Sequence, residues 1–175
     1  LPDIDFGIVP LHVIVGENDY VDDDKIDLTA MQEDLSSYKG KTSTSSPSPH
    51  EWENAFGDAD VVFCITITST LSGTYNSAVI AKDIYEQNHA GRKVYVLDSL
   101  STGPEIALFI EKIAELIKAG FAPDAIYKTL LEYKDKTHLY FSLASLNNFA
   151  KNGRISPVIA AGIGLLGVRV VGKAS

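Results

Sequence analysis

Residues 69–77 combine hydroxyl groups and a glycine in a pattern that suits binding of an anion. They read Ser-Thr-Leu-Ser-Gly-Thr-Tyr-Asn-Ser, between an apolar run at 61–68 and a segment with apolar residues at helical spacing. The apolar run is typical of a buried parallel strand. A turn from such a strand into a helix leaves backbone amides without partners, and these amides and the helix dipole attract a negative oxygen. Gly73 permits close approach of a ligand because it has no Cβ.

The same turn has two other interpretations. Ser72 and Thr74 can simply cap the following helix, and from the turn alone capping is the stronger interpretation. Ser72 also lies on a strand-turn-helix junction, as a hydrolase nucleophile does, but its neighbours read Thr-Leu-Ser-Gly-Thr instead of Gly-x-Ser-x-Gly. The sequence places no general base for it, so we expect a binding protein and no catalytic residues.

A second hydroxyl-rich segment, residues 41–49, precedes the same apolar strand. It reads Lys-Thr-Ser-Thr-Ser-Ser-Pro-Ser-Pro, and Ser48 with Glu51 predicts a capping box with Pro49 at the first helical position. Loops at the carboxyl ends of parallel strands line the ligand crevice of an α/β sheet. The turn after residue 68 lies at such an end, whereas the sequence leaves open whether residues 41–49 fold toward it.

The elements that must hold these loops alternate between strand and helix. The alternation predicts an α/β fold with a parallel sheet and helices on both faces. Capping boxes are expected at Thr29 with Gln32 and at Thr102 with Glu105. Residues 19–27 and 40–47 are expected to be an acidic loop and a polar loop. Strands are expected over residues 6–15, 61–68, 93–97 and 138–144, and helices over 29–38, 102–119, 123–133 and 146–151, as well as after residues 48 and 77.

Composition limits the classes of partner. The chain has 175 residues, 45% of them hydrophobic, and a formal net charge of -8, which argues against nucleic acid as the main partner. Its single cysteine, Cys64, lies in a strand and cannot form an internal disulfide, so we expect a cytoplasmic protein. No segment is long and apolar enough for stable membrane insertion. The histidines and the acidic run 22–24 lack the spacing of metal ligands, and we expect neither a metal nor a cofactor.

Five groups of short motifs occur in order along the chain. They are Val9-Pro10-Leu11 with Tyr20-Val21-Asp22, Thr44-Ser45-Ser46-Pro47-Ser48-Pro49, Leu71-Ser72-Gly73-Thr74-Tyr75, Asp98-Ser99 at the end of an apolar strand, and Asn152-Gly153-Arg154-Ile155-Ser156. Together they resemble the DegV family, the bacterial fatty-acid-binding proteins that serve fatty acid kinase. Ser46 and Asn152 depart from the family pattern, which has glutamine and glycine at these places.

The resemblance implies a two-domain architecture. The expected first domain is a three-layer α/β/α domain with a parallel sheet over residues 1–147, which carries the head-group loops. Residues 148–175 are expected to begin a second, smaller α/β domain that holds the lipid tunnel. Because the family's opening strand and its carboxyl-terminal portion have no counterpart here, we expect the chain to be incomplete.

The resemblance also implies the ligand and the partner. A long-chain fatty acid is expected to bind with its carboxylate on the hydroxyls of Thr44 and Ser72 and the amide of Gly73, and with its acyl chain buried. A separate fatty acid kinase would phosphorylate it, with Arg154 at the partner surface or the rim of the site. The alternatives are a serine-dependent hydrolase of lipids or esters, with Ser72 as nucleophile, and a scaffold with an incomplete pocket. The expected ligand-binding residues are Thr44, Ser45, Ser69, Ser72, Gly73, Thr74 and Arg154.

Overall fold

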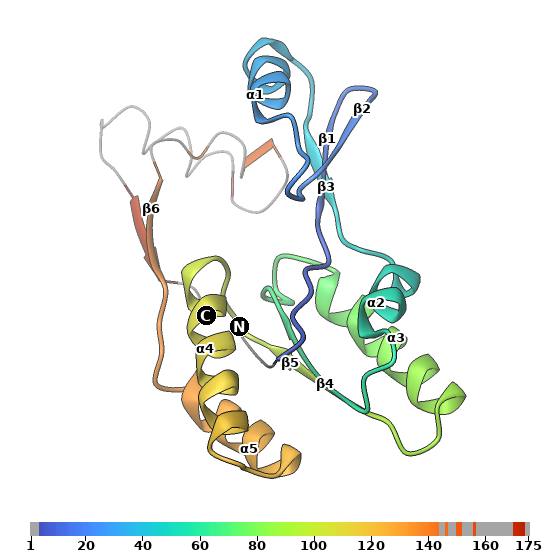
Figure 1. Ribbon diagram of the computed structural model, residues 1–175. Helices are drawn as coiled ribbons and strands as arrows, with labels where there is room; N and C mark the ends of the chain where they lie inside the picture. Colours follow the sequence, from blue (N-terminus) through green and yellow to red (C-terminus); the bar gives the residue numbers. More distant parts are fainter. Residues whose placement is uncertain (1–3, 144–145, 147–149, 152–155, 157–169, 174–175) are drawn as a thin grey trace. The chain divides into compact units, whose positions relative to one another are not determined.

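The chain forms two compact units (Figure 1). A computed structural model describes residues 4–143, 146, 150–151, 156 and 170–173. The first unit contains the described residues of 1–9 and 46–139, and the second contains those of 10–45 and 140–173. The parallel sheet belongs to the first unit, and two antiparallel sheets belong to the second.

The first unit is built on two parallel strands, β4 (Val61–Thr66) and β5 (Lys93–Asp98). They pair in register from Val61 opposite Lys93 to Thr66 opposite Asp98. This confirms the expected α/β fold with a parallel sheet. Four helices complete the unit: α2 (Pro49–Phe56), α3 (Thr74–Asn88), α4 (Pro104–Lys118) and α5 (Pro123–Lys134).

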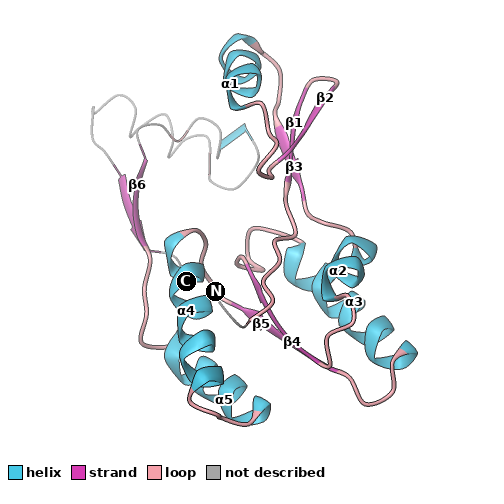
Figure 2. Ribbon diagram, viewed as in Figure 1, coloured by secondary structure: helices cyan, strands magenta, loops and turns pink. Residues whose placement is uncertain are grey.

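Helices cover both faces of this sheet. Because successive side chains of a strand point to opposite faces, each face has residues that pack against its helices. Figure 2 shows α2 and α3 on one side of the strands and α4 and α5 on the other. Val94 and Val96 of β5 pack in one buried cluster with α2 and α3, whereas Leu97 packs in a second cluster with α4 and α5. The buried members of the first cluster are Trp52, Phe56, Cys64, Ala78, Ala81, Tyr85, Val94 and Val96. Those of the second are Leu97, Phe109, Ile113, Leu116, Ile126 and Leu130.

The second unit contains a three-stranded antiparallel sheet that the sequence did not predict. Its order is β2-β1-β3, with strands β1 (His12–Val15), β2 (Asn18–Val21) and β3 (Ser43–Ser45). The strand expected from residue 6 begins only at His12. Residues 19–21 of the expected acidic loop belong to β2, and residues 43–45 of the expected polar loop form β3. Gly16, with a φ of 64°, occupies the turn between β1 and β2.

The end of the chain contributes one more strand pair to this unit. Strand β6 (Tyr140–Leu143) pairs with β7 (Val170–Lys173) in antiparallel orientation, which confirms a strand within the expected range 138–144. The helix expected at residues 146–151 falls largely outside the described residues. The predicted domain boundary between residues 147 and 148 stays a prediction for the same reason.

Two of the three expected capping boxes are wrong. Helix α1 (Leu28–Ser37) begins after Asp27, whose side chain accepts from the amide of Ala30 at 2.9 Å. The expected cap at Thr29 fails because this aspartate, an equally good capping residue, comes two positions earlier. Helix α4 begins at Pro104, after Gly103 with a φ of 54°, and has no side-chain cap. The expected box at Ser48 and Glu51 is present at the start of α2.

The cap of α1 provides a stability prediction with a matched control. Replacement of Asp27 by alanine is expected to lower the free energy of unfolding by about 1 kcal/mol, because the amide of Ala30 loses its acceptor. Thr29→Ala, two residues along the same chain, should change it by less than about 0.5 kcal/mol. Urea titrations followed by circular dichroism measure both values. An equal loss in the two variants would contradict the assignment of the cap.

Candidate functional site

The chain leaves β4 through a compact turn rich in hydroxyl groups. The amides of Leu71 and Ser72 donate to the carbonyl of Thr68 at 3.3 and 3.2 Å. The hydroxyls of Thr68 and Thr70 lie 2.8 Å apart in a hydrogen bond. Such local bonds compete with a strand ladder, which explains why β4 ends at Thr66 instead of residue 68.

Ser72 and Thr74 pair with one another at the start of α3. Their hydroxyl oxygens lie 2.7 Å apart, and the amide of Thr74 donates to Ser72 Oγ at 3.3 Å. The N-cap itself is Gly73, which has no side chain to offer. Ser72 therefore satisfies a single amide, and the capping interpretation explains only part of this turn.

Three backbone amides at this helix start remain available. Among the residues that the structure describes, none accepts a hydrogen bond from the amide of Gly73, Tyr75 or Asn76. Helix α3 has 15 residues, and its dipole adds partial positive charge at this end. Gly73 is exposed, Ser72 is half-buried and Thr74 is buried. The arrangement offers hydroxyl and amide donors to a negatively charged oxygen.

The second hydroxyl-rich loop meets this turn. The hydroxyl of Ser77, on α3, donates to the carbonyl of Pro47 at 2.5 Å. A Cβ on Gly73 would lie 3.1 Å from Ser46 Oγ, so the glycine permits close contact between the loop and the turn. The sequence left open whether residues 41–49 approach the turn, and the structure shows that Ser46 and Pro47 do.

The expected site residues fall into two described groups. Ser69, Ser72, Gly73 and Thr74 come together in the turn before α3, within the first unit. Thr44 and Ser45 lie on β3 in the second unit, with exposed side chains, where their residues pair with Val13 and His12. Arg154, the remaining candidate, lies outside the described residues.

Asp98 is a contact of the turn that sequence reasoning missed. It is the last residue of β5, and its Oδ1 accepts from the amides of Ser69 and Leu100, each at 3.1 Å. The amide of Thr68 also donates to the carbonyl of Ser101 at 2.8 Å. The sequence does contain a signal for this contact, which is a carboxylate at the end of the strand that follows the hydroxyl-rich turn.

Several further hydroxyls are buried beside this contact. Ser99 and Ser101 are 2% and 1% exposed, and the amide of Ser101 donates to Ser99 Oγ at 3.1 Å. Ser101 Oγ is one of two buried side-chain atoms in the described part of the chain that lack a hydrogen-bond partner, and the other is Trp52 Nε1. The loop after β5 is thus polar and closely packed.

Nucleophilic and metal chemistry find little support in the described residues. Burial raises the pKa of the Cys64 thiol to about 12, so the thiolate is scarce at neutral pH. Ser72 is bonded to Thr74, and no histidine ring bonded to Ser72 occurs in the described part of the chain. No group of three metal-ligating side chains occurs among the same residues.

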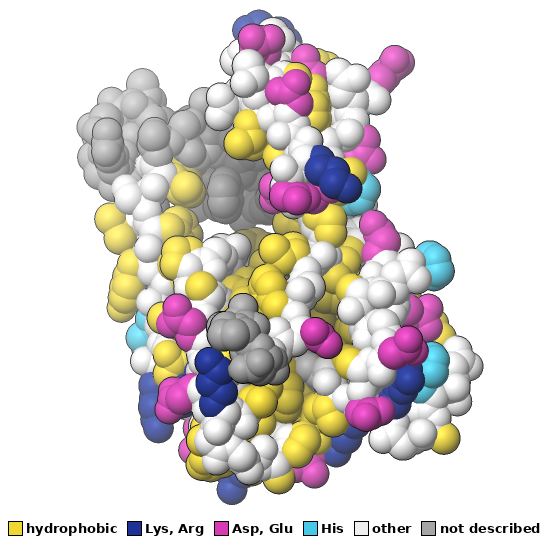
Figure 3. All heavy atoms as spheres, in the orientation of Figure 1, with side chains coloured by type: hydrophobic (Ala, Val, Ile, Leu, Met, Phe, Trp, Pro, Cys, Tyr) yellow, Lys and Arg dark blue, Asp and Glu magenta, His cyan; other side chains and the backbone are white. Residues whose placement is uncertain are grey.

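The described side chains on the face drawn in Figure 3 do not form the basic stripe expected of a nucleic-acid interface. On the face drawn in Figure 3, acidic side chains are spread among the basic ones. This distribution fits the net charge of -8. In the described chain, no helix combines the length and the apolar character that a membrane span requires.

Comparison with known proteins gives a match over nearly the whole chain. The model of an uncharacterised protein family, DegV, matches residues 2–175. A DegV domain-containing protein of Streptococcus pneumoniae is 41% identical over 170 residues, which are 97% of this chain and 60% of the relative. The chain thus spans three fifths of the length of this curated relative.

Solved structures of fatty-acid-loaded or fatty-acid-binding proteins resemble the chain in fold. A DegV family protein from Eubacterium eligens, loaded with heptadecanoic acid, has a TM-score of 0.94 at 39% identity and covers 100% of this chain and 63% of its own. The Streptococcus pneumoniae Fatty Acid Kinase (Fak) B3 protein, loaded with linoleic acid, has a TM-score of 0.91 at 41% identity, over 95% of this chain and 59% of its own. DegV from Bacillus subtilis, described as a fatty acid binding protein, has a TM-score of 0.76 at 26% identity, over 95% and 60%.

Proposed function

This chain belongs to the DegV family, and from that premise we propose that it binds a long-chain fatty acid and presents it to a separate fatty acid kinase. The observation that carries the proposal is the turn before α3, where hydroxyl groups lie beside three amides that have no acceptor among the described residues. Two relatives near 40% identity are described as loaded with heptadecanoic acid and with linoleic acid. The name of the second, Fatty Acid Kinase B3 protein, supports a kinase as partner.

In this proposal the fatty acid carboxylate binds the hydroxyl of Ser72 and the amide of Gly73. Ser69 and Thr74 belong to the same turn. A hydrogen bond to a charged group contributes about 1.5–3 kcal/mol, so a few of them hold the head group firmly. The family's motifs add three residues to this proposal, namely Thr44, Ser45 and Arg154. Thr44 is a further hydroxyl donor to the carboxylate, and Arg154 lies at the rim of the site or at the surface that meets the kinase.

The acyl chain supplies most of the remaining affinity. Burial of each methylene group contributes about 0.8 kcal/mol, so a long chain binds tightly without a charge pair of its own. The protein acts on this account as a carrier and not as an enzyme, with no cofactor besides its lipid. The sequence lacks the Gly-x-x-x-x-Gly-Lys-Ser/Thr motif of a nucleotide loop, as expected if the kinase supplies the nucleotide site. A single buried cysteine fits a reducing cytoplasm.

Native mass spectrometry of the full-length protein as purified tests this function. We expect a mass excess that corresponds to one fatty acid, and organic extraction with lipid identification should name it. A protein that is purified empty is then titrated with linoleic acid, the ligand of one relative. Absence of a co-purified lipid together with failure to bind linoleic acid would overturn the proposal.

A further inference from the structure

We propose that Asp98 is a positioning residue for the head-group turn, and this inference rests on the proposed function. Its carboxylate holds the turn before α3 in the shape that presents Ser72 and Gly73 to the ligand. Asp98 itself need not touch the ligand.

The position of Asp98 follows from the pairing of the sheet. Asp98 lies opposite Thr66, the last residue of β4, so its side chain is level with the start of the turn. One oxygen, Oδ1, accepts from the amide of Ser69 in the turn and from the amide of Leu100 in the next loop, each at 3.1 Å. A single carboxylate therefore joins the loops that follow the two parallel strands.

The place where these loops separate is a favourable one for a ligand. The loop after β4 leads to α3, which packs in the cluster on one face of the sheet. The loop after β5 leads to α4, which packs in the cluster on the other face. Ligands of open α/β sheets bind at the carboxyl ends of strands where neighbouring connections diverge in this way.

Asp98 is also the contact that reaches furthest into the turn. The other two links between the loops are backbone bonds, from Ser99 to the carbonyl of Thr66 at 3.2 Å and from Thr68 to the carbonyl of Ser101 at 2.8 Å. They reach no further along the turn than Thr68 and do not contact residues 69–74. In the described part of the chain, Asp98 is the one side chain of the β5 loop that bonds to residues 69–74.

The backbone beside Asp98 adds an independent sign of constraint. Leu100 has a φ of 53°, the only positive φ of a non-glycine residue among those described. This conformation is unfavourable for a leucine and persists where the surroundings enforce it, often at functional sites. The hydrogen bond from the Leu100 amide to Asp98 helps to hold this conformation.

The test separates the hydrogen bonds of Asp98 from its charge. Asp98→Ala removes the acceptor, whereas Asp98→Asn keeps an oxygen that can accept both amides, removes the negative charge and replaces the other oxygen by an NH2 group. The full-length variants are titrated with linoleic acid and with linoleyl alcohol, which has the same chain and a neutral head group. Thermal unfolding of each variant is recorded in parallel.

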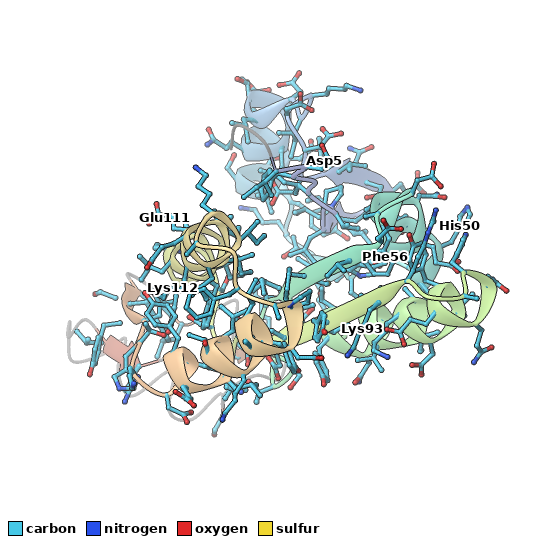
Figure 4. The ribbon with its side chains drawn as sticks, turned by 60° about the horizontal axis from the view of Figure 1, so that its bottom comes forward. Asp5, His50, Phe56, Lys93, Glu111 and Lys112 are labelled. Atoms are coloured by element: carbon cyan, nitrogen blue, oxygen red, sulfur yellow. The ribbon has the colours of Figure 1, made fainter. Side chains whose placement is uncertain are left out.

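A matched control lies at the opposite end of β5. Asp124 accepts from Lys93 Nζ at 2.7 Å and from the hydroxyl of Tyr95 at 2.6 Å, and Lys93 is the first residue of the strand (Figure 4). Asp124→Ala removes a carboxylate with two donors, as Asp98→Ala does, but away from the turn. It should leave the affinity for both lipids unchanged.

We expect Asp98→Ala to weaken binding of linoleic acid about tenfold and binding of the alcohol less than about twofold. Asp98→Asn should bind the acid within about twofold of the unmodified protein. An equal loss for acid and alcohol would show a merely structural role, and an unchanged affinity for the acid would also overturn the inference.

Two further outcomes are kept distinct. If Asp98→Ala does not fold, Asp98→Glu replaces it, since the extra methylene displaces the oxygen while the charge stays. Asp98→Glu should again weaken binding of linoleic acid more than binding of linoleyl alcohol. An unchanged affinity for the acid would overturn the inference. If the unmodified full-length protein carries no co-purified lipid and binds no linoleic acid, the proposed function itself fails, and the role of Asp98 falls with it.

Discussion

Replacement of Ser72 and Thr44 together by alanine lowers the affinity of the full-length protein for linoleic acid by roughly 100-fold. Each hydroxyl is expected to donate one hydrogen bond to the carboxylate, worth about 1.5 kcal/mol or more. Two such bonds correspond to about 3 kcal/mol, and each 1.4 kcal/mol changes the dissociation constant about tenfold. Isothermal titration calorimetry of the double variant and of both single variants measures the effect.

The control for this experiment is Thr129→Ala. The hydroxyl of Thr129 donates to the carbonyl of Ala125 on an exposed part of α5, away from the turn before α3. This variant should bind the fatty acid as the unmodified protein does. A double variant that binds within about twofold of the unmodified protein would show that the head group binds elsewhere.

Replacement of Phe109 by alanine lowers the free energy of unfolding by about 3–5 kcal/mol. Phe109 is 0% exposed at the centre of the cluster between β5, α4 and α5. Its ring makes an edge contact with Tyr133, with 5.6 Å between the ring centroids. The substitution leaves a cavity that helices anchored on a sheet cannot fully close. We expect the melting temperature to fall by about 10 °C.

The neighbouring residue serves as the control for Phe109. Leu108 lies on the same helix and is 43% exposed, so Leu108→Ala removes an apolar side chain without leaving a buried cavity. Its cost should stay below about 1 kcal/mol. Differential scanning calorimetry of the two variants compares them directly. Similar losses at both positions would contradict the described packing of α4.

The first unit could be predicted because its elements carry strong patterns. Strands β4 and β5 are largely apolar runs, as expected of strands in a parallel sheet, and their parallel orientation follows from the helix α3 that connects them. The helix starts at Pro49 and Pro123 are marked by proline at the first position. Local sequence therefore contains most of the information that fixes this unit.

The antiparallel sheet could not be predicted in the same way. Strand β3 consists of serine and threonine side chains that are all exposed, and β2 is exposed at three of its four positions. Neither has the alternation that marks a half-buried strand. Their pairing partner, β1, decides their conformation, and partner choice is a tertiary property.

The candidate site was predictable only in part. The residue types of the turn before α3 predict Ser72 and Gly73 as ligand-binding residues, because hydroxyls and glycine at a helix start favour an anion, and this assignment stays a prediction. The bond from Ser69 to Asp98 joins residues 29 positions apart and depends on which residue of β5 lies opposite the end of β4. That register is invisible in the turn itself, so the role of Asp98 needed the folded chain.

The polar character that hid β2 and β3 has a use of its own. Among the residues that the structure describes, the order β2-β1-β3 places these two strands at the edges of their sheet. An exposed edge with apolar side chains invites pairing with another copy of the chain and leads to aggregation. Strand β3 carries only serine and threonine side chains, whereas β2 begins with Asn18 and Asp19 and ends with Tyr20 and Val21, of which Val21 is 36% exposed. The polar residues that weaken the strand signal at β3 and at the start of β2 thus also reduce the apolar surface available for self-association.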